Sequence, residues 1–328
     1  MNHRSFFPFL LLTITAATSF AADLRIGMIG LDTSHATEFT RRFNDPADKG
    51  FVPGARVVAA VRQSSPDIED SWKRMPAFSK TMEDKYGVKM VDSIDEMLKQ
   101  VDVVMVESVD GRPHLAQTMP ALKAHKPVFL DKPAAASLRD VIEIYRAARE
   151  YNTPIYSGSS MRFATKLQEL KAMNVGELRG AISIGPAHTE AHHPDLYWYG
   201  IHPTEALYTI MGSGCETVAC TTTKFTHVVT GVWKDGKVGT LRGTRGGIEP
   251  YRIEVLGSEK MINEDLKVDY TPFLREVVKF FQTGVAPVTP EETLEIYAFM
   301  EAADESKRQG GCPVKIADVM LKAEAEKR

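Results

Sequence analysis

The first half of the chain repeats one pattern, in which a short apolar run is followed by a longer amphipathic segment. Continuous apolar runs predict buried strands, and apolar residues spaced three and four apart predict helices. The predicted strands are 24–30, 57–61, 103–106, 127–130 and 155–157, and the predicted helices are 34–43, 79–86, 93–99, 113–124 and 137–151. Apolar strands that alternate with helices are typical of a parallel sheet covered on both faces.

The pattern changes after Gly158. Predicted strands 178–184, 228–233, 238–241 and 252–256 follow one another around one helix, 204–211, and helices 272–283 and 290–308 come last. Successive strands indicate a largely antiparallel sheet. We therefore expect an α/β protein with a doubly wound N-terminal domain at 22–158 and a C-terminal α+β domain at 159–328, with the final helix and strand packing back on the first domain.

The N-terminal segment is typical of an export signal. Arg4 precedes a mostly apolar stretch, 6–17, and small residues flank Phe20. We expect a signal peptide at 1–21 and an exported protein, periplasmic or secreted, with no stable membrane insertion after cleavage. A membrane anchor is the alternative, although the run is shorter than the ~20 residues that span a bilayer. His3-Arg4 is similar to a degraded twin-arginine signal, so the export route stays open.

Composition narrows the class of protein. The 328 residues carry a formal net charge of -3, which gives no basic surface for nucleic acid. The three cysteines, Cys215, Cys220 and Cys312, allow at most one disulfide and are expected to be buried small residues.

The turn after the first strand has the position of a dinucleotide pyrophosphate site. Gly30 provides the tight turn, but Asp32 stands where a second glycine lets the backbone approach the phosphates. An aspartate at ~4 Å from a phosphate is repelled by about 4 kcal/mol at an effective dielectric constant of 20. We therefore expect Asp32 to point away, with Thr33, Ser34 and the helix N-terminus binding the anion. Simple capping of the helix is the alternative.

The second strand ends without the acidic residue that accepts the ribose hydroxyls of NAD. Arg62 and Ser64 follow it and suit a 2′-phosphate, so NADP is mildly favoured over NAD. A solvated surface arginine is the alternative.

Asp131-Lys132-Pro133 resembles the Glu-Lys-Pro signature of the glucose-fructose oxidoreductase, inositol dehydrogenase and rhizopine-catabolism family. Segments 121–128, 301–306 and 310–314 are also similar to that family, and His114 falls near its motif histidine. The resemblance implies a Rossmann fold that binds NAD(P), with His114 and Asp131 near the cofactor. It also implies that Lys132 is both catalytic and cofactor-binding, because it reaches the nicotinamide and stabilises charge on the substrate oxygen.

Residues 200–205 resemble the family's Gly-x-His-x-x-Asp segment. The resemblance implies that His202 is the catalytic proton carrier, as a neutral imidazole can be, and that Glu205 contacts substrate. The family's aspartate four residues before this histidine is replaced by Trp198. Either Asp195 or Glu190 takes the place of that aspartate as the partner of His202, or His202 has no carboxylate partner.

The loop 187–199 gathers polar and aromatic side chains. A metal site is one interpretation, but His188 and His192 lack the adjacent glutamate of a zinc protease, and two prolines leave little room for a helix. We therefore expect no metal and a carbohydrate-binding loop with Tyr199 stacking on a sugar, although a buried aromatic run is equally consistent. The expected substrate-binding residues are His188, Glu190, His192, Asp195, Tyr199 and Glu205.

The predicted function is NAD(P)-dependent oxidation or reduction of a secondary alcohol on a sugar, sugar acid or cyclitol. The partner is thus a small molecule, and a homo-oligomer through the C-terminal sheet is expected. Two alternatives remain at this point. One is a redox-neutral glycosidase or lyase that retains NAD, and the other is a binding protein that kept the fold and lost the cofactor.

Overall fold

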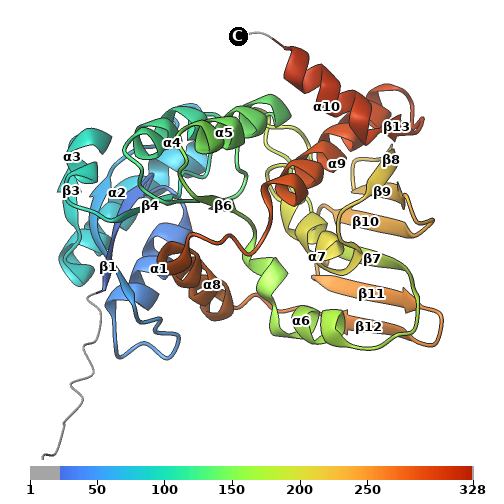
Figure 1. Ribbon diagram of the computed structural model, residues 1–328, viewed down its shortest axis with the longest axis horizontal. Coiled ribbons are helices and arrows are strands. Elements are labelled where there is room, and N and C mark those ends of the chain that lie inside the picture. The colour runs from blue at the N-terminus through green and yellow to red at the C-terminus, as the bar shows by residue number, and fades with distance from the viewer. Residues whose placement is uncertain (1–22, 327–328) are drawn as a thin grey trace, which may run out of the picture.

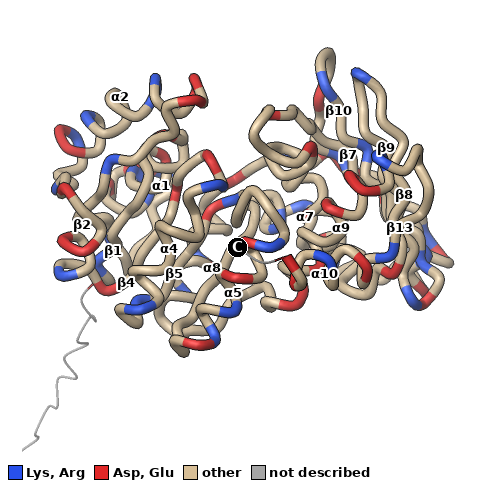
Figure 2. The backbone as a smooth tube through the Cα atoms, turned by 90° about the horizontal axis from the view of Figure 1, so that it is seen from above, with Lys and Arg blue, Asp and Glu red and all other residues tan. Residues whose placement is uncertain are grey.

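The computed structural model describes residues 23–326. The signal peptide expected at 1–21 lies outside this range. None of the helices within it is both long and apolar enough to cross a membrane. Figure 2 shows lysine and arginine interspersed with aspartate and glutamate over both halves of the molecule.

The first sheet has six parallel strands in the order β3-β2-β1-β4-β5-β6 (Figure 1). Their bounds are β1 Leu24–Ile29, β2 Ala55–Val61, β3 Lys89–Val91, β4 Val103–Val106, β5 Val128–Leu130 and β6 Ile155–Ser157. The strand order reverses between β1 and β4, and in such sheets a ligand crevice opens at that point, beyond the carboxyl ends of the strands.

Helices cover both faces of this sheet, because its strands are apolar on both sides. They are α1 Ser34–Asn44, α2 Glu69–Tyr86, α3 Ile94–Leu98, α4 His114–Lys123 and α5 Leu138–Glu150. One face is completed from far along the chain by α8, Tyr270–Thr283. Its Phe273 ring lies 5.9 Å from Phe39 of α1 and 5.4 Å from Phe129 of β5. The C-terminal half thus anchors itself in the first core.

The second sheet has seven strands in the order β12-β11-β7-β10-β9-β8-β13. They are β7 Leu178–Pro186, β8 Cys215–Thr222, β9 Thr226–Trp233, β10 Val238–Thr244, β11 Arg252–Gly257, β12 Met261–Asp265 and β13 Val314–Lys315. The β7–β10 pair is parallel and the other pairs are antiparallel. The remaining helices are α6 Thr165–Ala172, α7 Ile201–Met211, α9 Pro290–Arg308 and α10 Ile316–Ala325, after a 3-10 turn at Ser160–Phe163.

The predicted α/β class, with a parallel and a largely antiparallel sheet, is confirmed. The helix predicted at 79–86 begins earlier, at Glu69. The prediction started the helix after Pro76, whereas in the structure the helix continues through this proline. Helices α6 and α10 and strands β3, β8 and β12 were not predicted. The final strand, β13, pairs with β8 of the second sheet, whereas α10 contacts α5 of the first. All three cysteines are free, and Cys312 is exposed, contrary to its expected burial.

Candidate active site between the two sheets

A cavity of about 480 Å³ lies between the two halves of the molecule. The first half contributes the start of α1 and the residue that follows Asp131 at the end of β5. The second half contributes aromatic and polar side chains from the loops around its sheet. The principal lining residues are Thr33, Ser34, His35, Arg74, Lys132, His188, Trp198, Tyr199, His202, Glu249, Tyr251 and Tyr270.

Lys132 and His202 line this same cavity, although Lys132 follows β5 of the first half and His202 lies on α7 of the second. Tyr199 lies between them. Its ring centroid is 5.8 Å from Lys132 Nζ and 5.5 Å from the His202 ring. The chain therefore brings together the two residues predicted to be catalytic, and Tyr199 is the expected substrate-binding residue that contacts both.

The surroundings of His202 hold its imidazole in the neutral form. Burial lowers its pKa well below the usual value, and the charges of Lys132 and His35 lower it further, so the ring is neutral near pH 7. Its Nδ1 shares a 2.7 Å hydrogen bond with Ser159 Oγ. Because Ser159 engages one ring nitrogen, the other is the one left for a substrate proton.

The structure shows no carboxylate partner for His202 among the described residues. Asp195, the first substitute considered, accepts a 2.5 Å hydrogen bond from Lys307 Nζ. Glu190, the second, is 2.8 Å from a nitrogen of each of two histidines, His192 and His193. Ser159 takes the orienting position instead.

The turn after β1 shows how the chain accommodates Asp32. Its side chain is fully buried and accepts hydrogen bonds from Ser71 Oγ at 2.5 Å and from the Val109 N–H at 3.0 Å. Burial raises its pKa. The aspartate therefore ties the start of α2 and the end of β4 to the turn. Its position relative to a pyrophosphate stays a prediction.

Gly30 and Thr33 complete this turn. Gly30 has a φ of +80°, and a Cβ there would lie 2.1 Å from Ser108 Oγ, so the position requires glycine. Thr33 is the N-cap of α1 and accepts a 2.9 Å hydrogen bond from the His35 N–H. Ser34 is exposed at the cavity. The capping interpretation therefore holds for Thr33, and Ser34 remains available to a ligand.

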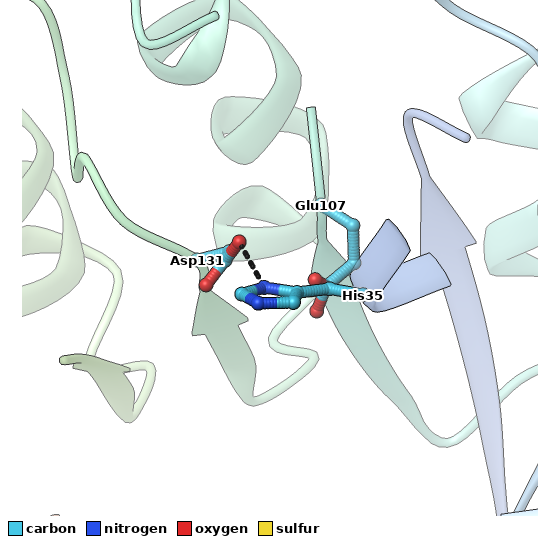
Figure 3. A group of neighbouring side chains, drawn as sticks. All are labelled: His35, Glu107 and Asp131. Atoms are coloured by element: carbon cyan, nitrogen blue, oxygen red, sulfur yellow. Dashed lines mark hydrogen bonds and ion pairs between the residues drawn. The ribbon is translucent and has the colours of Figure 1, made fainter. Parts of the chain in front are cut away.

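Three buried side chains meet beside the turn (Figure 3). His35 Nδ1 is 2.8 Å from Asp131 Oδ2, and the carboxylate of Glu107 converges on the same ring. Neither His35 nor Glu107 was predicted from the sequence to be a site residue. No sequence signal links them, because they come from α1 and the end of β4.

A second cavity, of about 880 Å³, adjoins the turn on its other side. It is lined by Asp32 and Ser108, whose chain neighbours Thr33 and Val109 line the first cavity. Arg62 and Ser64 also line it, at the carboxyl end of β2. Arg62 is exposed and pairs with Glu83 at 3.1 Å. This is the edge of the sheet where the sequence predicted a dinucleotide ribose.

His114, expected near the cofactor, is fully buried and lines neither cavity. Its Nε2 is 2.9 Å from the Ser108 carbonyl oxygen, so it supports the loop after β4 from behind. Asp131 is likewise buried under Lys132 and contacts His35.

The expected substrate-binding residues divide into two groups. His188 and Tyr199 line the cavity, and His188 Nε2 pairs with Glu249 at 2.8 Å. The others lie elsewhere: His192 pairs with Glu190, and Glu205 is buried and accepts a 2.6 Å hydrogen bond from Arg162 Nε. The structure thus corrects the expectation for Glu205, because burial requires its charge to be paired inside the protein.

Some cavity residues were missed from the sequence. Glu249 and Tyr251 lie just before the predicted strand 252–256, and Tyr270 begins α8. No sequence motif marks these residues. Arg74 and Asp70 belong to the part of α2 that the prediction omitted. Extending the predicted helix upstream of Pro76 would have put both residues on α2.

Asp195 belongs to a separate, partly buried charge cluster with Asp304 of α9. The Asp195 N–H donates to Asp304 Oδ2 at 3.1 Å. Burial, then the neighbouring Asp195 charge, raise the pKa of Asp304 to about 7, and Lys307 opposes this.

We expect Asp304→Asn to stabilise the protein at pH 8 by about 1–4 kcal/mol and to have little effect at pH 4. A raised folded-state pKa contributes stability that is full below the unfolded value, near 4, and is lost as pH rises through about 7. The variant is neutral at every pH and avoids that loss. Urea unfolding at both pH values measures the difference, with exposed Asp92→Asn as control. Equal stabilities at pH 8 would contradict the prediction.

Comparison with known proteins agrees with this geometry. Residues 24–159 match the family described as "Oxidoreductase family, NAD-binding Rossmann fold". The match covers the first of the two domains, the parallel sheet with its helices, which therefore has the Rossmann fold that this family describes. It is 25% identical over 187 residues to an uncharacterized oxidoreductase of Streptococcus pneumoniae, an alignment that spans 52% of the chain and about half (51%) of that relative.

Two solved structures show the same fold. A probable dehydrogenase from Thermotoga maritima has a TM-score of 0.73 at 22% identity, covering 90% of this chain and 100% of the other. A scyllo-inositol dehydrogenase from Lactobacillus casei, solved with bound NAD(H) and scyllo-inositol, has a TM-score of 0.70 at 18% identity, covering 90% and 100%. At these identities the similarity concerns the fold alone. The chemistry of this protein is therefore inferred from the residues of its own cavity.

Proposed function

We propose that the protein is an NAD(P)-dependent oxidoreductase that acts on a secondary alcohol of a sugar, sugar acid or cyclitol. The observation that carries this proposal is the convergence of Lys132 and neutral His202 on one cavity. That cavity adjoins the crevice where the strand order of the first sheet reverses.

The residues present suit a dinucleotide. Gly30 keeps the turn tight, and Ser34 lies at the N-terminus of α1. The carboxylate of Asp32 is engaged by its buried hydrogen bonds from Ser71 and Val109. Arg62 and Ser64 would hold the ribose end in the second cavity. When bound, the nicotinamide would accept or donate a hydride at the substrate carbon.

The protein residues would handle the proton and the developing charge. In the oxidation direction, His202 would take the hydroxyl proton while Ser159 holds the ring in orientation. The Lys132 ammonium would stabilise the negative charge that forms on the same oxygen. In reduction, the imidazolium would return the proton.

The lining supports a polyhydroxylated substrate. The rings of Tyr199, Tyr251 and Tyr270 provide flat apolar faces, and His188 with Glu249 provides a hydrogen-bonding edge. A bound scyllo-inositol in the Lactobacillus casei neighbour is consistent with a cyclitol or sugar.

The cofactor itself can be identified directly. Mass spectrometry of nucleotide released on denaturing the purified protein should find NAD or NADP, and candidate cyclitols and sugars should change the nicotinamide absorbance. Turnover without a net absorbance change would support a redox-neutral reaction. Failure to bind either nucleotide would overturn the proposal.

We expect Arg62→Asp to weaken NADP binding by about 10-fold or more while weakening NAD binding less, because a carboxylate repels the 2′-phosphate and accepts ribose hydroxyls. Fluorescence titration with each dinucleotide measures the ratio. Arg146→Asp is the matched control, since Arg146 is also exposed and paired with a glutamate, Glu143. An unchanged ratio would show that Arg62 lies outside the cofactor site.

Location and assembly are part of the same proposal. Export predicts that the mature chain begins after Ala21, which N-terminal sequencing of the extracytoplasmic protein tests. Exposed Val232 of β9 lies opposite exposed Val238 of β10 in the second sheet. We propose that this sheet mediates self-association, and light scattering coupled to gel filtration would show a single chain mass if it does not.

A further inference from the structure

The group of His35, Glu107 and Asp131 is not required by the reaction proposed above. Glu107 directly follows β4, Asp131 directly follows β5, and His35 lies in the first turn of α1. The fold thus brings one imidazole and two carboxylates to the crevice from three separate elements (Figure 3).

Glu107 is the unusual member of this group. Its side chain is 0% exposed, and neither carboxylate oxygen has a hydrogen-bond partner. Leaving a buried polar group unpaired is costly, and most such groups in native proteins are paired with protein, water or an ion. The second carboxylate, Asp131, is also buried and contacts only one of the two ring nitrogens of His35 in this structure. Glu107 therefore presents two carboxylate oxygens without protein hydrogen-bond partners to this group.

The three side chains are spaced for a metal ion. One ligand atom from each residue lies within 4.8 Å of the others. Ligands at about 2.0–2.2 Å from zinc are roughly 3–4 Å apart, so a small closing of the side chains would complete the site. We propose that His35, Glu107 and Asp131 bind a divalent first-row transition ion, with Zn²⁺ the favoured ion.

The ligand chemistry supports this choice. An imidazole combined with carboxylates suits zinc, whereas calcium and magnesium prefer oxygen ligands alone. A divalent charge balances the two buried carboxylates. Three protein ligands leave a fourth position open, as in catalytic zinc sites.

The open position has a defined neighbourhood. His35 lines the cavity that contains Lys132 and His202, so an ion bound to it lies at the wall of that cavity. Water or a substrate oxygen is the fourth ligand expected there. The ion undergoes no redox change in this role.

The loop histidines are weaker candidates. Glu190 hydrogen bonds with both His192 and His193, and His193 Nε2 accepts from the Gly111 N–H at 3.0 Å. Because these groups already have partners, no ion is needed to satisfy them.

The test is zinc binding by the full chain. The protein is stripped with chelator, titrated with ZnCl₂ by calorimetry, and separately assayed by elemental analysis after purification from zinc-supplemented medium. We expect one equivalent of zinc in the wild type. Glu107→Gln and His35→Asn should each weaken binding by 100-fold or more, and the loop variant Glu190→Gln should bind as the wild type does.

Each alternative outcome is decisive. Absence of zinc from the wild type in both measurements overturns the proposal, whether or not the variants fold. Loss of binding in Glu190→Gln alone would place the ion on the loop and also overturn it. Circular dichroism establishes that the variants are folded. Wild-type zinc affinity in both folded variants would also overturn the proposal. These readouts do not depend on nucleotide, so they stand apart from the oxidoreductase proposal.

Discussion

Replacing Lys132 with methionine should lower kcat by about 10²- to 10⁴-fold, while the dissociation constant of the dinucleotide changes only a few-fold. Methionine keeps much of the apolar stem of the lysine and removes the ammonium, whose Nζ lies 5.8 Å from the centroid of the Tyr199 ring. The loss should therefore fall on the step in which negative charge develops on the substrate oxygen. Steady-state kinetics with the substrate found above, together with nucleotide titration, separate these two quantities.

His202→Asn should produce a loss of similar size, because the amide cannot accept a proton. Lys166→Met is the control for Lys132, since Lys166 is exposed on α6 and pairs with Glu169. If both cavity variants turn over substrate at the wild-type rate, the two residues are not catalytic and the cavity has another use. If nucleotide binding is lost together with turnover, Lys132 contributes to cofactor binding instead.

Arg162→Met should destabilise the protein by about 3–5 kcal/mol, the largest effect on stability that we expect. Arg162 lies in the turn that joins the two sheets and is buried. Its Nε is 2.6 Å from Glu205 of α7 and its Nη1 is 2.8 Å from Glu292 of α9. Removing the guanidinium leaves two neighbouring carboxylates without a compensating charge.

Equilibrium unfolding in urea measures this effect. Glu205→Gln should cost less, because Arg162 keeps its contact with Glu292, and the double variant Arg162→Met/Glu205→Gln should recover part of the stability by removing one buried charge. Arg146→Met, on the exposed surface of α5, should change stability by less than about 0.5 kcal/mol. A loss below about 1 kcal/mol in Arg162→Met would show that the pair is replaceable.

The prediction of the fold depended on local pattern. Residues 103–106 were predicted as a strand because they are apolar without interruption, and this range matches the structure. The range predicted for the last strand, 155–157, matches as well, although it ends on Ser157. β12 was missed because its residues alternate between half-buried and exposed, so its sequence carries little apolar signal. β8 is rich in threonine and cysteine, and it was missed although its buried residues pack against α9.

The sequence by itself determined the alternation of strands and helices in the first domain, the glycine turn, and the motifs that contain Lys132 and His202. Periodicity, glycine and short motifs are properties of neighbouring residues, so they can be recognised without the fold. The tertiary structure decided which distant side chains meet. Ser159 hydrogen bonds with His202, and the carboxylates of Glu107 and Asp131 converge on His35. Glu205 pairs with Arg162 and does not line the cavity. These contacts follow from the burial of polar groups against whatever elements the fold brings together, and burial depends on the packing of the whole chain.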